Sequence, residues 1–110
     1  MSDQVFYENI GKILLESGPE LAREIIVRAR IFAEGDGGEY EFDYIGPDGK
    51  LNWFSPAGRA VRALTEELVR MRSFYAENNL AGKDGRWNRC EIKLSLGENK
   101  LLISFSYDKG

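Results

Sequence analysis

Residues 24–44, which read EIIVRARIFAEGDGGEYEFDY, decide the fold. In the first half of this stretch every second residue is apolar, and the residues between them are mixed. The apolar set is Ile25, Val27, Ala29, Ile31 and Ala33. A period of two with many β-branched residues predicts a strand from Glu24 to Glu34. One face of this strand is expected to be covered and the other partly in contact with water.

A second alternation begins after the glycine-rich residues 35–38. Three aromatic residues alternate with three acidic ones, in the order Glu39, Tyr40, Glu41, Phe42, Asp43 and Tyr44. Because side chains of a strand point to opposite faces in turn, all three carboxylates are predicted to share one face. The glycines lack the Gly-Lys-Ser/Thr ending of a phosphate loop and lead into a strand, so they are interpreted as a hairpin turn.

Two helices, a short helical turn and a third strand are predicted before and after this hairpin. Apolar residues spaced by three and four predict a helix that opens at Ser2 and ends at 17–19, followed by a short helical turn over Pro19 to Arg23. The turn at 47–49 predicts a third strand over Leu51 to Phe54. Ser55 as N-cap and Pro56 as first residue predict a long helix to about Asn79.

The chain closes with a loop over 82–85 and two more alternating segments, around 90–96 and 101–107. The predicted order is therefore α-β-β-β-α-β-β. Short connections favour antiparallel pairing, so the expected fold class is α+β, with the helices packed on one face of an antiparallel sheet. Residues 1–110 are expected to form a single domain, since no linker or repeat interrupts them.

Composition excludes many classes of enzyme. The 110 residues include no histidine, which removes the commonest general base and metal ligand. Cys90, the only cysteine, has no partner for an internal disulfide and fits a reducing compartment. No apolar stretch is long enough to span a bilayer, and the N-terminus does not resemble a signal peptide. We expect a cytoplasmic protein with no enzyme activity, no cofactor and no metal.

The net charge of −3 is unevenly distributed. Between Arg30 and Lys50 there is no basic residue, but there are six acidic ones: Glu34, Asp36, Glu39, Glu41, Asp43 and Asp48. This distribution predicts an acidic surface. The row at 39, 41 and 43 is interpreted either as a solvated face or as a face that binds a basic partner, with catalysis or a hard cation as the weaker alternative.

Three other candidate sites have simpler explanations. Cys90 is predicted to be a small buried side chain, because no histidine can activate it. Basic residues gather on the long helix and around Trp87, a combination that can bind nucleic acid, but interspersed acids favour an ordinary helix surface. Phe54 is predicted to face outward beside the acidic row if Leu51 and Trp53 face inward, and it would then anchor an interface. Capping of the core is the alternative.

The order of these features resembles the YezG-like family of antitoxin or immunity proteins. The resemblance lies in the short leading helix, the acidic glycine-rich hairpin and the tryptophan before the closing hairpin. The residues that carry it are Pro19-Glu20-Leu21, Phe74-Tyr75, Asn78-Asn79 and the stretch from Ile103 to Asp108. Another immunity family of contact-dependent growth inhibition or polymorphic toxin systems is an equal alternative.

The resemblance implies a bacterial protein that binds and neutralises a cognate toxin, often a nuclease domain. An acidic protein can occupy the basic cleft of a nuclease and is steered toward it. The expected toxin-binding residues are Asp36, Glu39, Glu41, Asp43, Asp48 and Phe54. We expect a monomer or weak dimer that contacts neither nucleic acid nor membrane directly. The alternative is a class I type III secretion chaperone, which the element order and acidic pI also resemble.

Overall fold

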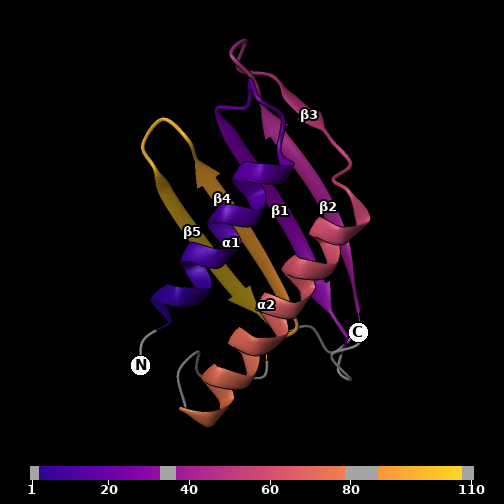
Figure 1. The fold of residues 1–110 in the computed structure, drawn as a ribbon, viewed down its shortest axis with the longest axis vertical. Helices are drawn as coiled ribbons and strands as arrows, with labels where there is room; N and C mark the ends of the chain where they lie inside the picture. The colour runs from indigo at the N-terminus through magenta and orange to yellow at the C-terminus, as the bar shows by residue number, and fades with distance from the viewer. Residues whose placement is uncertain (1–2, 33–36, 79–86, 108–110) are drawn as a thin grey trace.

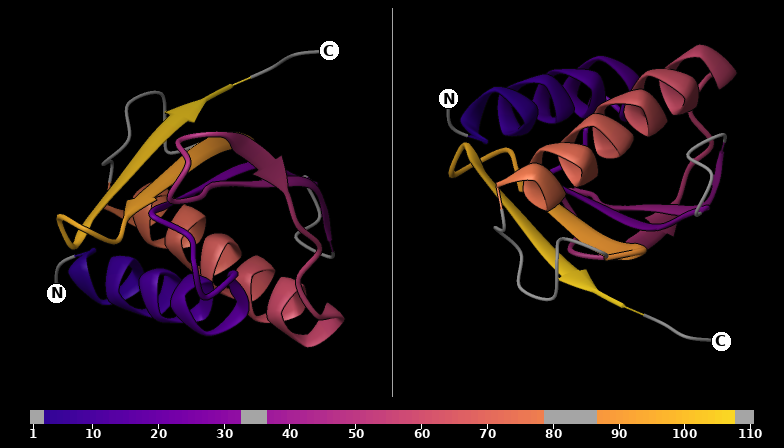
Figure 2. Two further views of the ribbon diagram at one scale, coloured as in Figure 1. Left: turned by 90° about the horizontal axis from the view of Figure 1, so that it is seen from above. Right: turned by 90° about the horizontal axis from the view of Figure 1, so that it is seen from below.

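The computed structural model describes residues 3–32, 37–78 and 87–107, and it confirms the predicted order of elements. The helices and strands are α1 (Gln4–Ser17), β1 (Glu24–Ile31), β2 (Gly38–Ile45), β3 (Leu51–Trp53), α2 (Gly58–Glu77), β4 (Arg89–Ser95) and β5 (Lys100–Ser106). The α+β prediction is confirmed, and both helices lie on the same side of the sheet (Figure 1, Figure 2).

The five strands form one antiparallel sheet in the order β3-β2-β1-β4-β5. The alternating segment β1 is the central strand, with β2 on one side and β4 on the other. Val27, for example, lies opposite Phe42 and Ile92. This central position explains why its apolar set is buried, because a middle strand has neighbours on both sides and helices above it.

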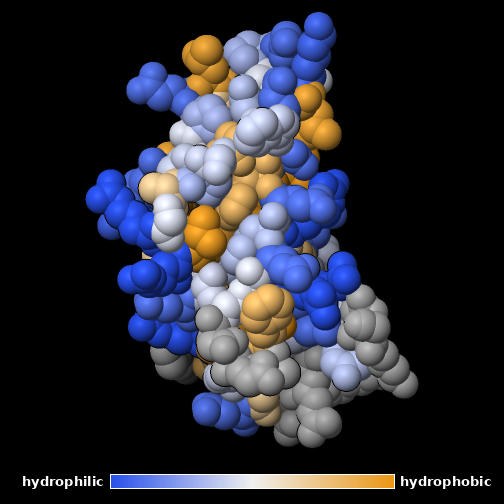
Figure 3. All heavy atoms as spheres, turned by 90° about the vertical axis from the view of Figure 1, so that its right-hand side faces the viewer, coloured by the Kyte–Doolittle hydropathy of each residue, from blue (hydrophilic) through white to orange (hydrophobic). Residues whose placement is uncertain are grey.

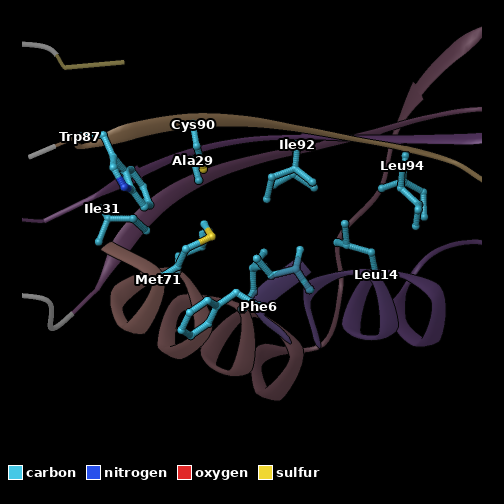
Figure 4. Close-up of a cluster of buried hydrophobic side chains, with 14 of the residues drawn as sticks. Phe6, Leu14, Ala29, Ile31, Met71, Trp87, Cys90, Ile92 and Leu94 are labelled. Atoms are coloured by element: carbon cyan, nitrogen blue, oxygen red, sulfur yellow. The ribbon is translucent and has the colours of Figure 1, made fainter. Parts of the chain in front are cut away.

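The core fills the space between the two helices and the inner face of the sheet, by which we mean the face toward α1 and α2. Figure 4 shows Leu14 of α1 and Met71 of α2 facing side chains from β1 and β4, while the ring of Phe6 extends toward α2, where it contacts Phe74. Ile92 lies near the middle and is fully buried. One continuous apolar cluster therefore holds both layers together.

Polar contacts join the two helices to each other and to the sheet. The Tyr75 hydroxyl donates to the Asp3 carboxylate (2.7 Å), which joins the end of α2 to the start of α1. Asn9 donates to the buried carboxylate of Glu67 (3.2 Å) between the helices. Arg72 donates to the carbonyl of Phe32 (3.0 Å), so this arginine attaches α2 to the end of β1.

Several predicted boundaries were wrong. The segment after α1 forms a single turn, in which the Ala22 amide donates to the Pro19 carbonyl, and it does not form a helical turn. α2 starts at Gly58 with Ala57 at the N-cap, two residues later than predicted, because residues 55–57 complete the crossing from the sheet edge to the helix. Ser2, the hairpin turn at 35–36 and the loop at 82–85 lie outside the described residues. No helix in the described ranges is long and apolar enough to cross a membrane.

Candidate functional site

The outer face of the sheet, the face away from α1 and α2, is the candidate site. Neither helix covers it (Figure 2). Glu39, Glu41 and Asp43 all lie on this face, as the alternation predicts, while Tyr40, Phe42 and Tyr44 pack toward the core. The described sheet therefore presents an open surface that includes the predicted acidic row.

The acidic row is paired with arginines from β1. The strand register places Arg28 opposite Glu41 and Arg30 opposite Glu39. Arg28 Nη1 lies 3.2 Å from Asp43 Oδ2 and 3.6 Å from Glu41 Oε2, and Arg30 Nη1 lies 3.6 Å from Glu39 Oε2. Opposite charges directly across a strand pair stabilise the sheet modestly. These pairs make the surface less acidic than the sequence predicted.

The strands carry equal numbers of acidic and basic side chains on the outer face. The register assigns it five acids and five bases, namely Glu24, Glu39, Glu41, Asp43 and Glu91 with Arg28, Arg30, Arg89, Lys93 and Lys100. The acids concentrate on β2, whereas β1 and β4 carry two bases each and β5 carries one. The face is thus polarised across the sheet, with its acidic side toward β3.

Two further predicted site residues are not part of this row. Asp48 lies in the turn between β2 and β3, where its Oδ1 accepts the Lys50 amide (3.0 Å). The carboxylate thus shapes the turn, and it extends the acidic side beyond the end of β2. Asp36 lies outside the described residues.

The outward orientation predicted for Phe54 was wrong, its alternative of capping the core is confirmed, and Trp53 takes the outward place. Phe54 packs against Phe42 and Tyr44, with ring centroids 5.7 and 5.9 Å apart, on the helix side of the sheet. Trp53 pairs with Asp43, so its side chain lies on the outer face, and it is 77% exposed. The turn at 47–49 sets this register by pairing Leu51 with Ile45.

Trp53 begins a row of side chains that crosses the entire outer face. The register orders this row as Trp53, Asp43, Ile26, Lys93 and Leu102, one from each strand. Ile26 in the centre is only 9% exposed, whereas Leu102 at the far edge is 53% exposed. The row thus places exposed apolar side chains at both edges of the outer face, with charged side chains on either side of the central Ile26.

Cys90, the acidic side chains and Trp87 are the remaining candidates for chemistry or nucleic-acid binding. The Cys90 thiol is buried, and burial raises its pKa to about 12, so it is protonated at neutral pH and cannot act as a nucleophile. Within the described ranges, no group of three or more acidic or cysteine side chains could hold a metal ion. Trp87 is buried against Phe105 and offers no surface for stacking a base.

Comparison of the sequence with protein-family models and with curated proteins gave no match. The resemblance to the YezG-like family therefore stands on the residue pattern alone.

Proposed function

We propose that this protein is an immunity protein, which binds and neutralises a toxin domain through the β2–β3 side of its outer sheet face. The contact surface would comprise Trp53, Leu51, Asp43 and Glu41, with Asp48 at the end of the hairpin. Glu39 would extend it along β2. Such a protein acts by occupying its partner and needs no catalytic group of its own.

The exposed indole of Trp53 is the observation that carries this proposal. Tryptophan provides a large apolar area together with an N–H donor, and it is enriched among the residues that dominate binding energy. Here it stands next to the Asp43 carboxylate, which pairs with Arg28 at 3.2 Å. An aromatic anchor beside carboxylates suits a partner with an apolar pocket surrounded by basic residues.

The charge of the hairpin supports a basic partner. Residues 38–54 contain four acids and a single basic residue, Lys50. A nuclease holds phosphate groups with basic side chains, so an acidic hairpin can steer toward that surface and cover it. Glu41 is suited to this contact because its side chain is 73% exposed despite its pairing with Arg28.

The test is a growth-rescue assay. The full chain is expressed together with the toxin domain encoded by the neighbouring gene, and the two proteins are co-purified. We expect the wild-type protein to bind the toxin and to restore growth. Failure of the wild-type protein to do either contradicts the proposal. Binding of an extended effector segment without rescue would favour the secretion-chaperone alternative.

Two leucines provide a matched pair of variants for this assay. Leu51 on the outer face and Leu15 on α1 are similarly exposed, at 58% and 56%. Leu51→Ala is expected to weaken binding, and Leu15→Ala is expected to leave it unchanged, because α1 lies on the other side of the sheet. Neutral variants such as Glu41→Gln are preferable to lysine substitutions, since a lysine would stand beside Arg28 and destabilise the fold.

A further inference from the structure

The edge of the sheet beside α2 is only partly occupied by β3. β3 pairs with residues 43–45 of β2, and the Phe54 amide donates to the Phe42 carbonyl (3.0 Å). The chain then leaves the sheet for α2. In the described ranges no strand pairs with Gly38–Glu41 on this side. Half of β2 is therefore an open edge.

Some backbone N–H and C=O groups of this open edge point away from β1, to the side where a further strand could pair with them. Residues of a strand aim their N–H and C=O groups alternately to the two sides. The Phe42 carbonyl bonds toward β3, whereas the Gly37 and Ile45 carbonyls accept from Phe32 and Arg23 on the β1 side. By this alternation, Gly38 and Tyr40 direct their backbone groups away from β1, to the open side.

A groove runs along this edge between β2 and α2. It consists of two hollows that share Tyr40 and Val61. One also reaches Thr65 and Val69 of α2, and the other reaches Phe42 and Phe54. The Tyr40 and Thr65 hydroxyls are hydrogen-bonded to each other across it. Figure 3 shows an apolar strip on this side of the molecule, bordered on both sides by hydrophilic residues.

We propose that this groove binds an extended segment of a partner protein, which adds to β2 as an antiparallel strand in line with β3. Addition of a strand to an open edge beside a helix is an established mode of peptide recognition, in which backbone bonds provide affinity and side-chain positions provide specificity. About four residues of the segment would pair, since that is the length of the open edge.

The side chains around the groove define the chemistry of this segment. A residue opposite Tyr40 would share its face and pack on Val61 and Thr65, so it is apolar. Residues opposite Glu39 and Glu41 would lie on the outer face beside these carboxylates, so they are basic. A residue opposite Gly38 meets no side chain there and packs toward Val69, so it is also apolar. The expected pattern is basic-apolar-basic-apolar.

The rim formed by α2 adds no charge preference of its own. It carries Arg62, Glu66 and Arg70, of which Arg70 pairs with Glu67 (3.2 Å). The two carboxylates of β2 are thus the groups that select the charge of the segment. This inference goes beyond the immunity proposal, because the groove can bind a segment whether or not the outer face binds a toxin.

The probe is the peptide Gly-Lys-Val-Lys-Val-Lys-Gly amide with carboxyfluorescein on its N-terminal amine, and its binding is followed by fluorescence anisotropy. Two modified peptides accompany it. One has glutamate at each lysine, and the other carries an N-methyl group on the first valine, which removes the amide expected to donate to Tyr40. We expect each change to weaken binding at least tenfold. Equal binding of either modified peptide would overturn the proposal, as would no binding of the lysine peptide.

Two glycines allow a matched pair of protein variants. A Cβ atom at Gly58, which lines the groove, or at Gly11 of α1 would meet no atom within 4 Å. Gly58→Trp is expected to fill the groove and weaken peptide binding at least tenfold, and Gly11→Trp is expected to leave binding unchanged. Circular dichroism and thermal unfolding establish that both variants fold. Unchanged peptide binding by folded Gly58→Trp would contradict the assignment of the groove.

Discussion

The two faces of the central strand β1 differ in their charged residues, although they share one backbone. On the inner face, Ile25, Val27 and Ile31 are almost fully removed from water by the helices. On the outer face, Arg28 and Arg30 are paired with carboxylates from neighbouring strands. Burial of apolar area provides most of the stability of a fold, and exposed ion pairs provide little. The difference shows that the outer face can evolve for binding at small cost to stability.

The largest expected effect compares two leucines on opposite faces of the sheet. Leu94 of β4 points into the core, and Leu102 of β5 points outward. Leu94→Ala is expected to lower the free energy of unfolding by about 2–5 kcal/mol, because it removes buried methyl groups and leaves a cavity. Leu102→Ala is expected to cost less than about 1 kcal/mol. Urea denaturation measures both, and similar losses would contradict the assignment of faces.

The buried thiol of the inner face predicts alkaline destabilisation. The pKa of Cys90 is raised from its ordinary value of 9.0 to about 12, so above pH 9 the unfolded chain loses this proton while the folded chain keeps it. Stability should therefore fall as pH rises, by at most about 1.4 kcal/mol per pH unit from this group. Burial also raises the pKa of Tyr40 and Tyr75, and both add to the fall above about pH 10.

Cys90→Ala isolates the contribution of the thiol. This variant is expected to be less stable at neutral pH and to lose less stability between pH 8 and 10 than the wild-type protein. The measurement is urea denaturation at several pH values. Parallel pH profiles for the two proteins would contradict this prediction, because they would show that the pKa of the Cys90 thiol is the same in the folded and the unfolded chain.

Glu67 is a buried carboxylic residue on the helix side of the sheet, in contrast to the exposed charged residues of the outer face. Its carboxylate accepts from Asn9 and pairs with Arg70, both at 3.2 Å. Glu67→Ala leaves the Asn9 amide without this acceptor, and we expect a loss of about 1–2 kcal/mol in the free energy of unfolding. The exposed neighbour Glu66 is the control, and Glu66→Ala should change stability by less than about 0.5 kcal/mol. Thermal unfolding distinguishes the two, and equal shifts would argue against this role.

The smallest expected effect concerns the ion pairs of the outer face. Arg28 is half-exposed and reaches carboxylates on both β2 and β4. Arg28→Met keeps most of the apolar stem and is expected to change stability by less than about 1 kcal/mol, since exposed pairs are screened by solvent. Denaturation at low and high salt measures this effect, and a loss above about 2 kcal/mol would show that the outer face also supports the fold.

The sequence predicted the central hairpin well, because its two alternations have strong contrast between apolar and charged residues. It could not predict the orientation of β3. Leu51, Asn52, Trp53 and Phe54 include three large apolar residues in four, so alternation does not identify the buried face. The pairing of Ile45 with Leu51 across the turn decides it and places Trp53 outward.

The sequence pattern could not predict which arginines pair with the acidic row. Arg28 and Arg30 were placed on the mixed face of the first strand, but which carboxylates they oppose depends on the hairpin register. That register is an outcome of the whole sheet, since a shift by one residue moves every side chain to the other face. The open edge beside α2 depends likewise on where β3 ends.

The most direct test of the proposed binding face is the dissociation constant of Trp53→Ala for the toxin domain encoded by the neighbouring gene. Isothermal titration calorimetry gives this constant for the variant, for the wild-type protein and for the control Leu15→Ala. If Trp53 anchors the interface, the variant should bind at least about 30-fold more weakly, which corresponds to about 2 kcal/mol. Leu15→Ala should bind like the wild-type protein. Equal affinity of Trp53→Ala and wild type would contradict the assignment of the outer face as the binding surface.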